Sequence, residues 1–155
     1  MQVTISKLRH AFVARLSEWE AACILTLWGV VLLMPSPIFD GGAWVAFRIL
    51  MPENALGLCC LAGGLVRLSV LAANGAWRPM YYVRAWLALT SFAVWVAIVL
   101  GFLSSGQIGT WIAVYPTLAL FDAVNVFRAM SDAAFYEKGR RVESRGVTRH
   151  APDPA

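Results

Sequence analysis

The chain has 155 residues, of which 59% are hydrophobic and only 14% are charged, with a formal net charge of +4. A soluble domain of this length usually contains about a quarter charged residues. The composition therefore excludes an ordinary water-soluble globule. The apolar residues gather in runs separated by short polar or Pro/Gly-bearing joints, and this pattern is typical of a bundle of membrane helices.

Residues 1–20 predict an amphipathic helix that lies along the membrane interface. From residue 5 onward, apolar side chains recur at steps of three and four, and Lys, Arg and Glu occupy positions between them. One apolar stripe on an otherwise charged helix favours a position at the bilayer surface.

Four apolar stretches are predicted to cross the membrane, at about residues 21–34, 55–73, 85–103 and 110–127. The first is only about 21 Å long as a helix, against a hydrocarbon core of ~30 Å, so neighbouring residues must complete its crossing. Between the first two spans, Trp44 and Phe47 mark a short interfacial or re-entrant helix. We therefore expect an all-α polytopic membrane protein, with a four-transmembrane-helix bundle in residues 21–128. Residues 129–155 are basic and predicted to be a mostly disordered cytoplasmic tail.

The distribution of Lys and Arg predicts the orientation. Three lie in residues 1–20, two in residues 74–84 and six in residues 128–155, whereas the connections at 35–54 and 104–109 hold one and none. Cytoplasmic loops carry the excess of basic residues. Both termini are thus expected on the cytoplasmic side of a bacterial inner membrane.

A buried polar layer is predicted toward the cytoplasmic side. Arg67 and Asp122 lie in different spans at a similar depth, roughly 9–10 Å from their cytoplasmic ends, and an unpaired charge there would be costly, so we expect them to touch. The residues assigned to the layer are Glu18, Glu20, Arg67, Asp122, Asn125 and Arg128. The layer is interpreted as structural glue or, alternatively, as a proton or ion relay or an interface for another membrane helix.

Two further groups of residues are candidates for contacts. Small residues at a spacing of four predict close helix packing, within the bundle or between copies: Ala93, Ala97, Gly101, Ala119 and Ala123. Basic residues beyond the last span are expected to contact lipid head groups: Lys138, Arg140, Arg141 and Arg145.

No catalytic or cofactor site is predicted. The two histidines, His10 and His150, lie outside the predicted spans, so a histidine-ligated zinc or haem within the bundle is not expected. Motifs of metalloproteases, α/β-hydrolases and P-loop proteins are missing from the sequence. We expect a protein that is not an enzyme and needs no metal or cofactor. Its partners would be the lipid bilayer and a membrane protein, itself or another, and nucleic acid is not expected.

Several segments resemble small four-span membrane proteins of tailed bacteriophages and prophages. These segments are Trp19-Glu20, LWGVVLLMP, MPENALGL, GGLVRLSVLAANGAWR and YPTLALFDAVNVFRAMSDA, and they fall within residues 17–135. Members of that group are mostly uncharacterised, and some are labelled holin-like. The resemblance implies a phage or prophage product in the host's inner membrane, and it carries over no catalytic residue. We expect a membrane assembly or accessory component that works through helix packing. The alternatives are a holin-like pore former in host lysis and a small ion or solute transporter.

Overall fold

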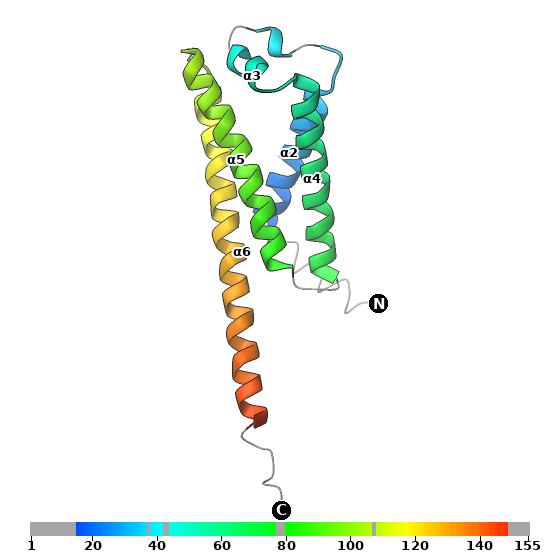
Figure 1. The fold of residues 1–155 in the computed structure, drawn as a ribbon, viewed down its shortest axis with the longest axis vertical. Coiled ribbons are helices and arrows are strands. Elements are labelled where there is room, and N and C mark those ends of the chain that lie inside the picture. The colour runs from blue at the N-terminus through cyan, green and yellow to red at the C-terminus, as the bar shows by residue number, and fades with distance from the viewer. Residues whose placement is uncertain (1–14, 37, 42–43, 77–79, 107, 149–155) are drawn as a thin grey trace, which may run out of the picture.

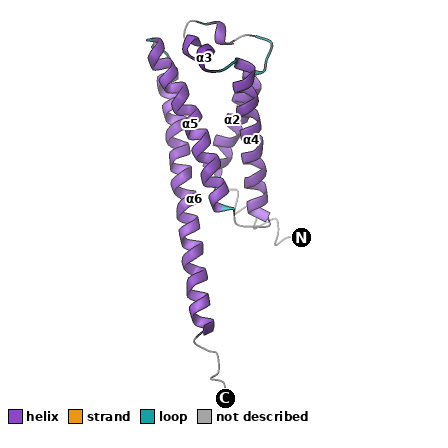
Figure 2. Ribbon diagram, in the orientation of Figure 1, coloured by secondary structure: helices purple, strands orange, loops and turns teal. Residues whose placement is uncertain are grey.

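The computed structural model describes residues 15–36, 38–41, 44–76, 80–106 and 108–148, which form helices and connections with no strand among them (Figure 2). Four long helices run up and down along one axis (Figure 1): α2 (Leu16–Leu32), α4 (Glu53–Ala76), α5 (Tyr81–Ser105) and α6 (Trp111–Thr148). Two short pieces, η1 (Ile38–Asp40) and α3 (Val45–Leu50), join α2 to α4. The predicted all-helical class is confirmed, whereas the predicted amphipathic helix lies mostly outside the described residues.

Three of the helices are long and apolar enough to cross a membrane: Glu53–Ala73, Tyr81–Ser105 and Trp111–Arg141. They coincide with the last three predicted spans. α2 has 17 residues, which makes it about 25 Å long and shorter than a ~30 Å hydrocarbon core. The structure thus supports a helical membrane protein with three spanning helices.

The long helices pair as two antiparallel hairpins, α2 with α4 and α5 with α6, and contacts between the hairpins are fewer (Figure 1). On α2, α4 and α5 the buried residues include a stripe at alternating steps of four and three, the seven-residue spacing of coiled-coil packing. On α6 the buried positions follow one another at steps of three, three, four and four. On α4 this stripe is Gly57, Cys60, Gly64, Arg67 and Leu71, and on α5 it is Arg84, Ala88, Ser91, Trp95, Ile98 and Phe102. We call these buried stripes the seams.

Glycines set the close approach of α2 to α4. A Cβ placed on Gly29 would lie 2.3 Å from the backbone nitrogen of Leu61, and one on Gly64 would lie 2.3 Å from Oγ1 of Thr26. Neither distance leaves room for a methyl group, so the two backbones meet as in other small-residue contacts of membrane helices.

Aromatic side chains fill the end of the bundle where α3 lies. Trp44 stacks on Phe39 with ring centroids 5.1 Å apart, and its edge meets Phe102 of α5 at 4.6 Å. Trp28 of α2 contacts Tyr115 of α6 at 5.5 Å. The predicted short helix around Trp44 and Phe47 therefore exists, and it closes the bundle at this end.

The carboxylate of Glu53 also ties this connection to α4. It accepts hydrogen bonds from the backbone nitrogens of Ile38, at 2.9 Å, and Phe39, at 3.1 Å. Arg48 pairs with Asp40 at 3.3 Å on the exposed side of the same connection. At the far end of α5, Gly106 adopts a positive φ of 68°, a left-handed conformation that ends the helix.

α6 continues well beyond its apolar part. It has 38 residues, roughly 57 Å of helix, and it extends past the other helices at the end where α2 begins (Figure 1). The prediction that residues 129–155 are mostly disordered is wrong as far as Thr148, because the helix runs to that residue. Residues 149–155 lie outside the described part of the chain.

Candidate functional site

The seams bury six charged or polar residues between the middle of the bundle and the end where α2 begins. These residues are Glu18, Arg67, Arg84, Ser91, Asp122 and Asn125, each no more than 4% exposed. They are contributed by all four long helices. We call this set the polar layer, and it is the candidate functional site because ionisable groups at membrane depth are costly to retain.

Arg67 and Asp122 form the central ion pair of the layer. Nη2 of Arg67 lies 2.6 Å from Oδ1 of Asp122, and their side chains are 3% and 0% exposed. The predicted contact between these two residues is confirmed. The guanidinium approaches the carboxylate off the hydrogen-bonding direction, and its buried Nη1 and Nη2 atoms have no well-aligned acceptor among the described residues.

The second oxygen of Asp122 is held by α5. Ser91 donates its hydroxyl proton to Oδ2 at 2.5 Å, and Nε1 of Trp95 donates to the same atom at 3.1 Å. Together with Arg67, these donors surround the carboxylate with contacts from α4 and α5. The charge of Asp122 is therefore compensated locally, as a buried carboxylate requires.

Arg84 is the centre of a second cluster, nearer the start of α2. Its Nε donates to Oε2 of Glu18 at 2.9 Å, and its Nη2 bonds to the other oxygen of that carboxylate. Nη1 donates to Asp132 of α6 at 3.1 Å. This two-point pairing suits a planar guanidinium, and it joins α2, α5 and α6.

A chain of hydrogen bonds extends the first cluster from Asp122 to the start of α2. Asn125 donates weakly to Asp122 at 3.5 Å and accepts the hydroxyl proton of Ser17 at 3.0 Å. Arg128 donates to the same hydroxyl, also at 3.0 Å. α6 thus makes polar contacts with α2 at this level.

The predicted members of the layer separate into those that join it and one that does not. Arg67, Asp122 and Asn125 form one connected set, and Arg128 reaches it through Ser17. Glu18 is buried but pairs with Arg84. Glu20 is exposed on α2, so its assignment to the layer is wrong: it lies two residues from Glu18, a step that places it on another face of the helix.

Sequence reasoning missed five members or neighbours of the site: Ser17, Arg84, Ser91, Trp95 and Asp132. The sequence nevertheless contains a pattern that indicates the residues of α5. Arg84, Ser91 and Ile98 follow one another at steps of seven, with Trp95 and Phe102 interleaved at the same period. This spacing places Arg84 on the buried face of a helix, whereas the predicted span began only at residue 85.

The predicted small-residue contacts hold only in part. Gly101 and Ala119 are buried, Ala123 is half-buried, and Ala93 and Ala97 are exposed on the outer face of α5. A Cβ on Gly101 would lie 2.5 Å from the ring of Phe47, so this glycine accommodates α3. The prediction that Ala93 and Ala97 pack inside the bundle is therefore wrong.

The basic residues predicted to meet lipid head groups lie on the projecting part of α6. Lys138, Arg140 and Arg141 are exposed there. Arg145 belongs to the same helix, but its side chain is outside the described part of the structure.

Comparisons with models of protein families, with curated protein sequences and with solved structures find no match to this chain. The site must therefore be interpreted from its own geometry.

The chemistry of the layer is that of compensated charge. Arg67 with Asp122, and Arg84 with Glu18 and Asp132, bring every one of these charges within reach of an opposite charge. The arrangement favours holding these helices together, because separating a pair would leave a charge buried alone.

Proposed function

We propose that this chain is a non-enzymatic integral membrane protein with four spans, acting as an assembly or accessory component that presents α6 at the membrane surface. The observation that carries the proposal is the position of α6. Its polar side chains contact the three other long helices, through Arg67 on α4, Ser91 on α5 and Ser17 on α2. The same helix then continues beyond the bundle.

The packing of α2 supports a fourth span. Gly29 lies against Gly57 and Leu61 of α4, and Thr26 lies against Gly64, which places α2 alongside the middle of a spanning helix. This position favours a fourth span formed by α2. The residues after Leu32, as far as the buried Phe39, supply the length that α2 lacks.

The distribution of basic residues supports an orientation with both termini in the cytoplasm. In that orientation the α3 end of the bundle, where Arg48 is the only Lys or Arg of residues 35–54, faces away from the cytoplasm. The projecting part of α6, which carries Lys138, Arg140 and Arg141, is cytoplasmic. A bacterial inner membrane and a phage or prophage origin stay predictions that rest on the sequence pattern alone.

A presenting role fits the rigidity of this arrangement. Breaking α6 away from the other helices would leave Arg67 buried without Asp122 and would take Asp132 from Arg84, a cost of several kcal/mol. The projecting part, from about Tyr136 to Thr148, is roughly 20 Å long. A fixed helix of this length, with Lys138, Arg140 and Arg141 exposed on it, is suited to binding another protein at the membrane.

A holin-like role is the second candidate, and one observation favours it. Ala93 and Ala97 are exposed on α5, where small residues would let a second copy approach closely in the bilayer. A pore former that accumulates in the membrane needs such contacts between copies.

Cross-linking in cells separates the two roles. A photoreactive residue replaces Lys138 on the projecting helix or, as the control, the lipid-facing Leu120, which is 65% exposed. We expect a discrete cross-linked protein at position 138 and none at position 120, with a steady membrane potential during induced expression. An abrupt loss of potential after a delay, or equal cross-linking at the two positions, would contradict the presenting role.

Truncation provides a second arm. A chain that ends after Tyr136 retains the polar layer and all the predicted spans, so it should insert and keep its melting temperature. On a native gel we expect the full chain to run as a larger complex with its partner and the shortened chain to lose that complex. A complex of unchanged size would show that the projecting helix is not the contact.

A further inference from the structure

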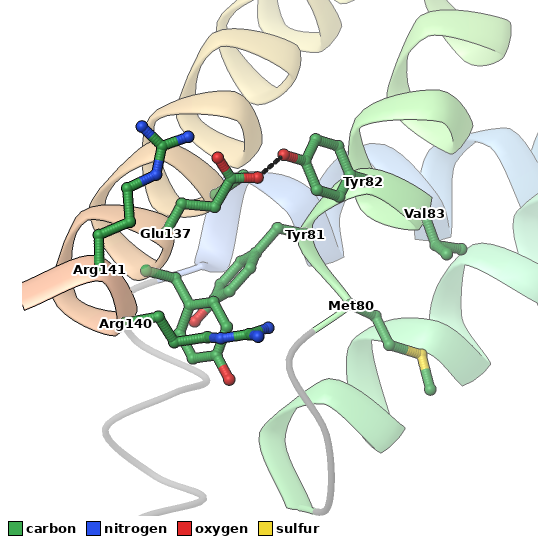
Figure 3. A pocket seen from close by; sticks show the side chains of 9 residues that line it. Met80, Tyr81, Tyr82, Val83, Glu137, Arg140 and Arg141 are labelled. Carbon is green, nitrogen blue, oxygen red and sulfur yellow. Dashed lines mark hydrogen bonds between the residues drawn. The ribbon is translucent and has the colours of Figure 1, made fainter. Parts of the chain in front are cut away.

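A pocket lies where α5 begins and α6 leaves the bundle (Figure 3). Its volume is about 640 Å³, within the range of small-ligand sites. Three tyrosines and three charged residues dominate its lining: Tyr81, Tyr82, Tyr136, Glu137, Arg140 and Arg141. We call it the tyrosine–arginine pocket.

The pocket is at the level of the membrane surface. Tyr81 is the first residue of a spanning helix, and its ring lies 5.6 Å from that of Tyr136 on α6. The guanidinium of Arg84, within the polar layer, lies 6.0 Å from the Tyr81 ring. Aromatic rings with polar tips are enriched at this depth, so the pocket opens where head groups are found.

The electrostatics of the pocket favour an anion. Arg140 and Arg141 contribute two positive charges against the single carboxylate of Glu137. One oxygen of that carboxylate already accepts the hydroxyl proton of Tyr82 (Figure 3). The N-terminus of α5 also faces this region and has no side-chain cap from Met80, which adds the partial positive charge of a helix start.

The surroundings point to a lipid as the source of that anion. Val83 and Trp86 of α5 continue from the pocket toward the bilayer, and they are 45% and 66% exposed. Acyl chains can lie along these apolar side chains while the head group remains in the pocket. A soluble phosphate compound would gain nothing from them.

We propose that the tyrosine–arginine pocket binds the phosphate of an anionic phospholipid. The guanidinium groups of Arg140 and Arg141 bind the phosphate oxygens, and the hydroxyls of Tyr81 and Tyr136 donate to the same group. The remaining oxygen of Glu137 accepts a hydroxyl of the head group. This site uses the first turns of the projecting part of α6, but it needs no protein partner, so it can fail or hold separately from the presenting role.

Native mass spectrometry of the full chain in detergent tests the site. The protein is titrated with phosphatidylglycerol or phosphatidylcholine, and binding of the first lipid is measured. We expect phosphatidylglycerol to bind first and more tightly. Arg140→Gln should weaken that binding about tenfold. The matched control is Lys138→Gln, which removes the same charge from the same helix but does not line the pocket, and it should change binding less than about twofold.

Three results would overturn the proposal. Equal effects of Arg140→Gln and Lys138→Gln would mean that the basic helix attracts lipid without a defined site. Equal affinity for phosphatidylcholine would mean that the negative charge of the head group is not recognised. Displacement of the lipid by glycerol phosphate at the same concentration would identify a site for a soluble phosphate. Arg140 is exposed, so unchanged melting temperatures should accompany these measurements.

Discussion

The carboxylate of Asp122 contacts side chains from two of the other long helices. One oxygen faces Arg67 of α4, and the other receives Ser91 and Trp95 of α5. A fully buried carboxylate with these partners is satisfied only while the helices keep their positions. Substitution of Asp122 therefore tests how the two hairpins are joined.

We expect Arg67→Gln and Asp122→Asn each to lower the free energy of unfolding by about 3 kcal/mol, because each leaves the other charge buried and unpaired. The double variant should lose less than the sum, since neither charge remains. The measurement is unfolding of the detergent-solubilised protein followed by circular dichroism. Strictly additive losses would contradict the pairing.

Exchanging the two charges is not expected to restore stability. Arg at position 122 would direct donors toward Nε1 of Trp95, which can only donate. The acceptor role of position 122 comes from α5 as much as from Arg67, so neutral substitutions test the ion pair more cleanly than the exchanged pair does.

Glu18 and Glu20 form a matched pair of substitutions on one helix. Glu18 binds Arg84, whose side chain is 1% exposed, whereas Glu20 is exposed. Glu18→Gln should cost about 2 kcal/mol, because it weakens hydrogen bonds to a buried guanidinium. Glu20→Gln should stay within about 0.5 kcal/mol. Equal melting temperatures for the two variants would show that the second cluster does not hold α2.

The sequence allowed the central ion pair to be predicted but not the second cluster. Counting residues from the ends of the spans placed Arg67 and Asp122 at one depth. The free-energy cost of an unpaired charge at that depth then predicted that the two residues pair. Arg84 was assigned to a cytoplasmic connection because the predicted span began at residue 85. α5 begins at Tyr81, so one turn of helix decided whether this arginine was a loop residue or a buried one.

At the scale of elements, the α2–α4 hairpin depends on glycine. A Cβ on Gly64 would lie 2.7 Å from the backbone nitrogen of Thr26, whereas one on Gly63 meets only Leu25, at 3.8 Å. Gly64→Ala should therefore destabilise the protein by about 1–3 kcal/mol. Gly63→Ala should be neutral or slightly stabilising, because alanine is the better helix former.

Thermal unfolding of the two alanine variants in detergent checks this prediction. The substitutions are chemically identical and adjacent, so helix propensity and hydrophobicity are matched between them. A melting temperature for Gly64→Ala equal to that of Gly63→Ala would mean that α2 and α4 are not in close backbone contact.

The sequence did not predict that α6 extends beyond the bundle, and the reason lies in how a helix is continued. Residues beyond Tyr136 have little to bury, and low hydrophobicity predicts disorder. The helix is instead continued from a spanning segment, so it needs no new nucleus. Glu137 and Arg141 are also spaced by four residues, which favours a helix.

At the scale of the whole molecule, hydrophobic patterning was enough to predict the helices, because each long apolar run must satisfy its backbone in the bilayer. It was not enough to predict their pairing. The two hairpins are defined by which seams face each other, and steps of three and four are shared by all of them. Only the residues that fit one partner, such as Gly64 against Thr26, distinguish the pairs.

The number of spans follows from the position of α2 and can be tested by labelling. In a background with Cys23, Cys59 and Cys60 replaced by alanine, single cysteines replace Asp40 in the α3 connection or Lys138 on α6. Removing Asp40 should cost little, because its pair with Arg48 is exposed. An N-terminal epitope tag reports the third position.

Four spans with cytoplasmic termini predict that a membrane-impermeant maleimide labels position 40 in intact spheroplasts. Position 138 and the tag should become accessible only after permeabilisation. If α2 does not cross, the tag will instead be accessible together with position 40, and the bundle has three spans.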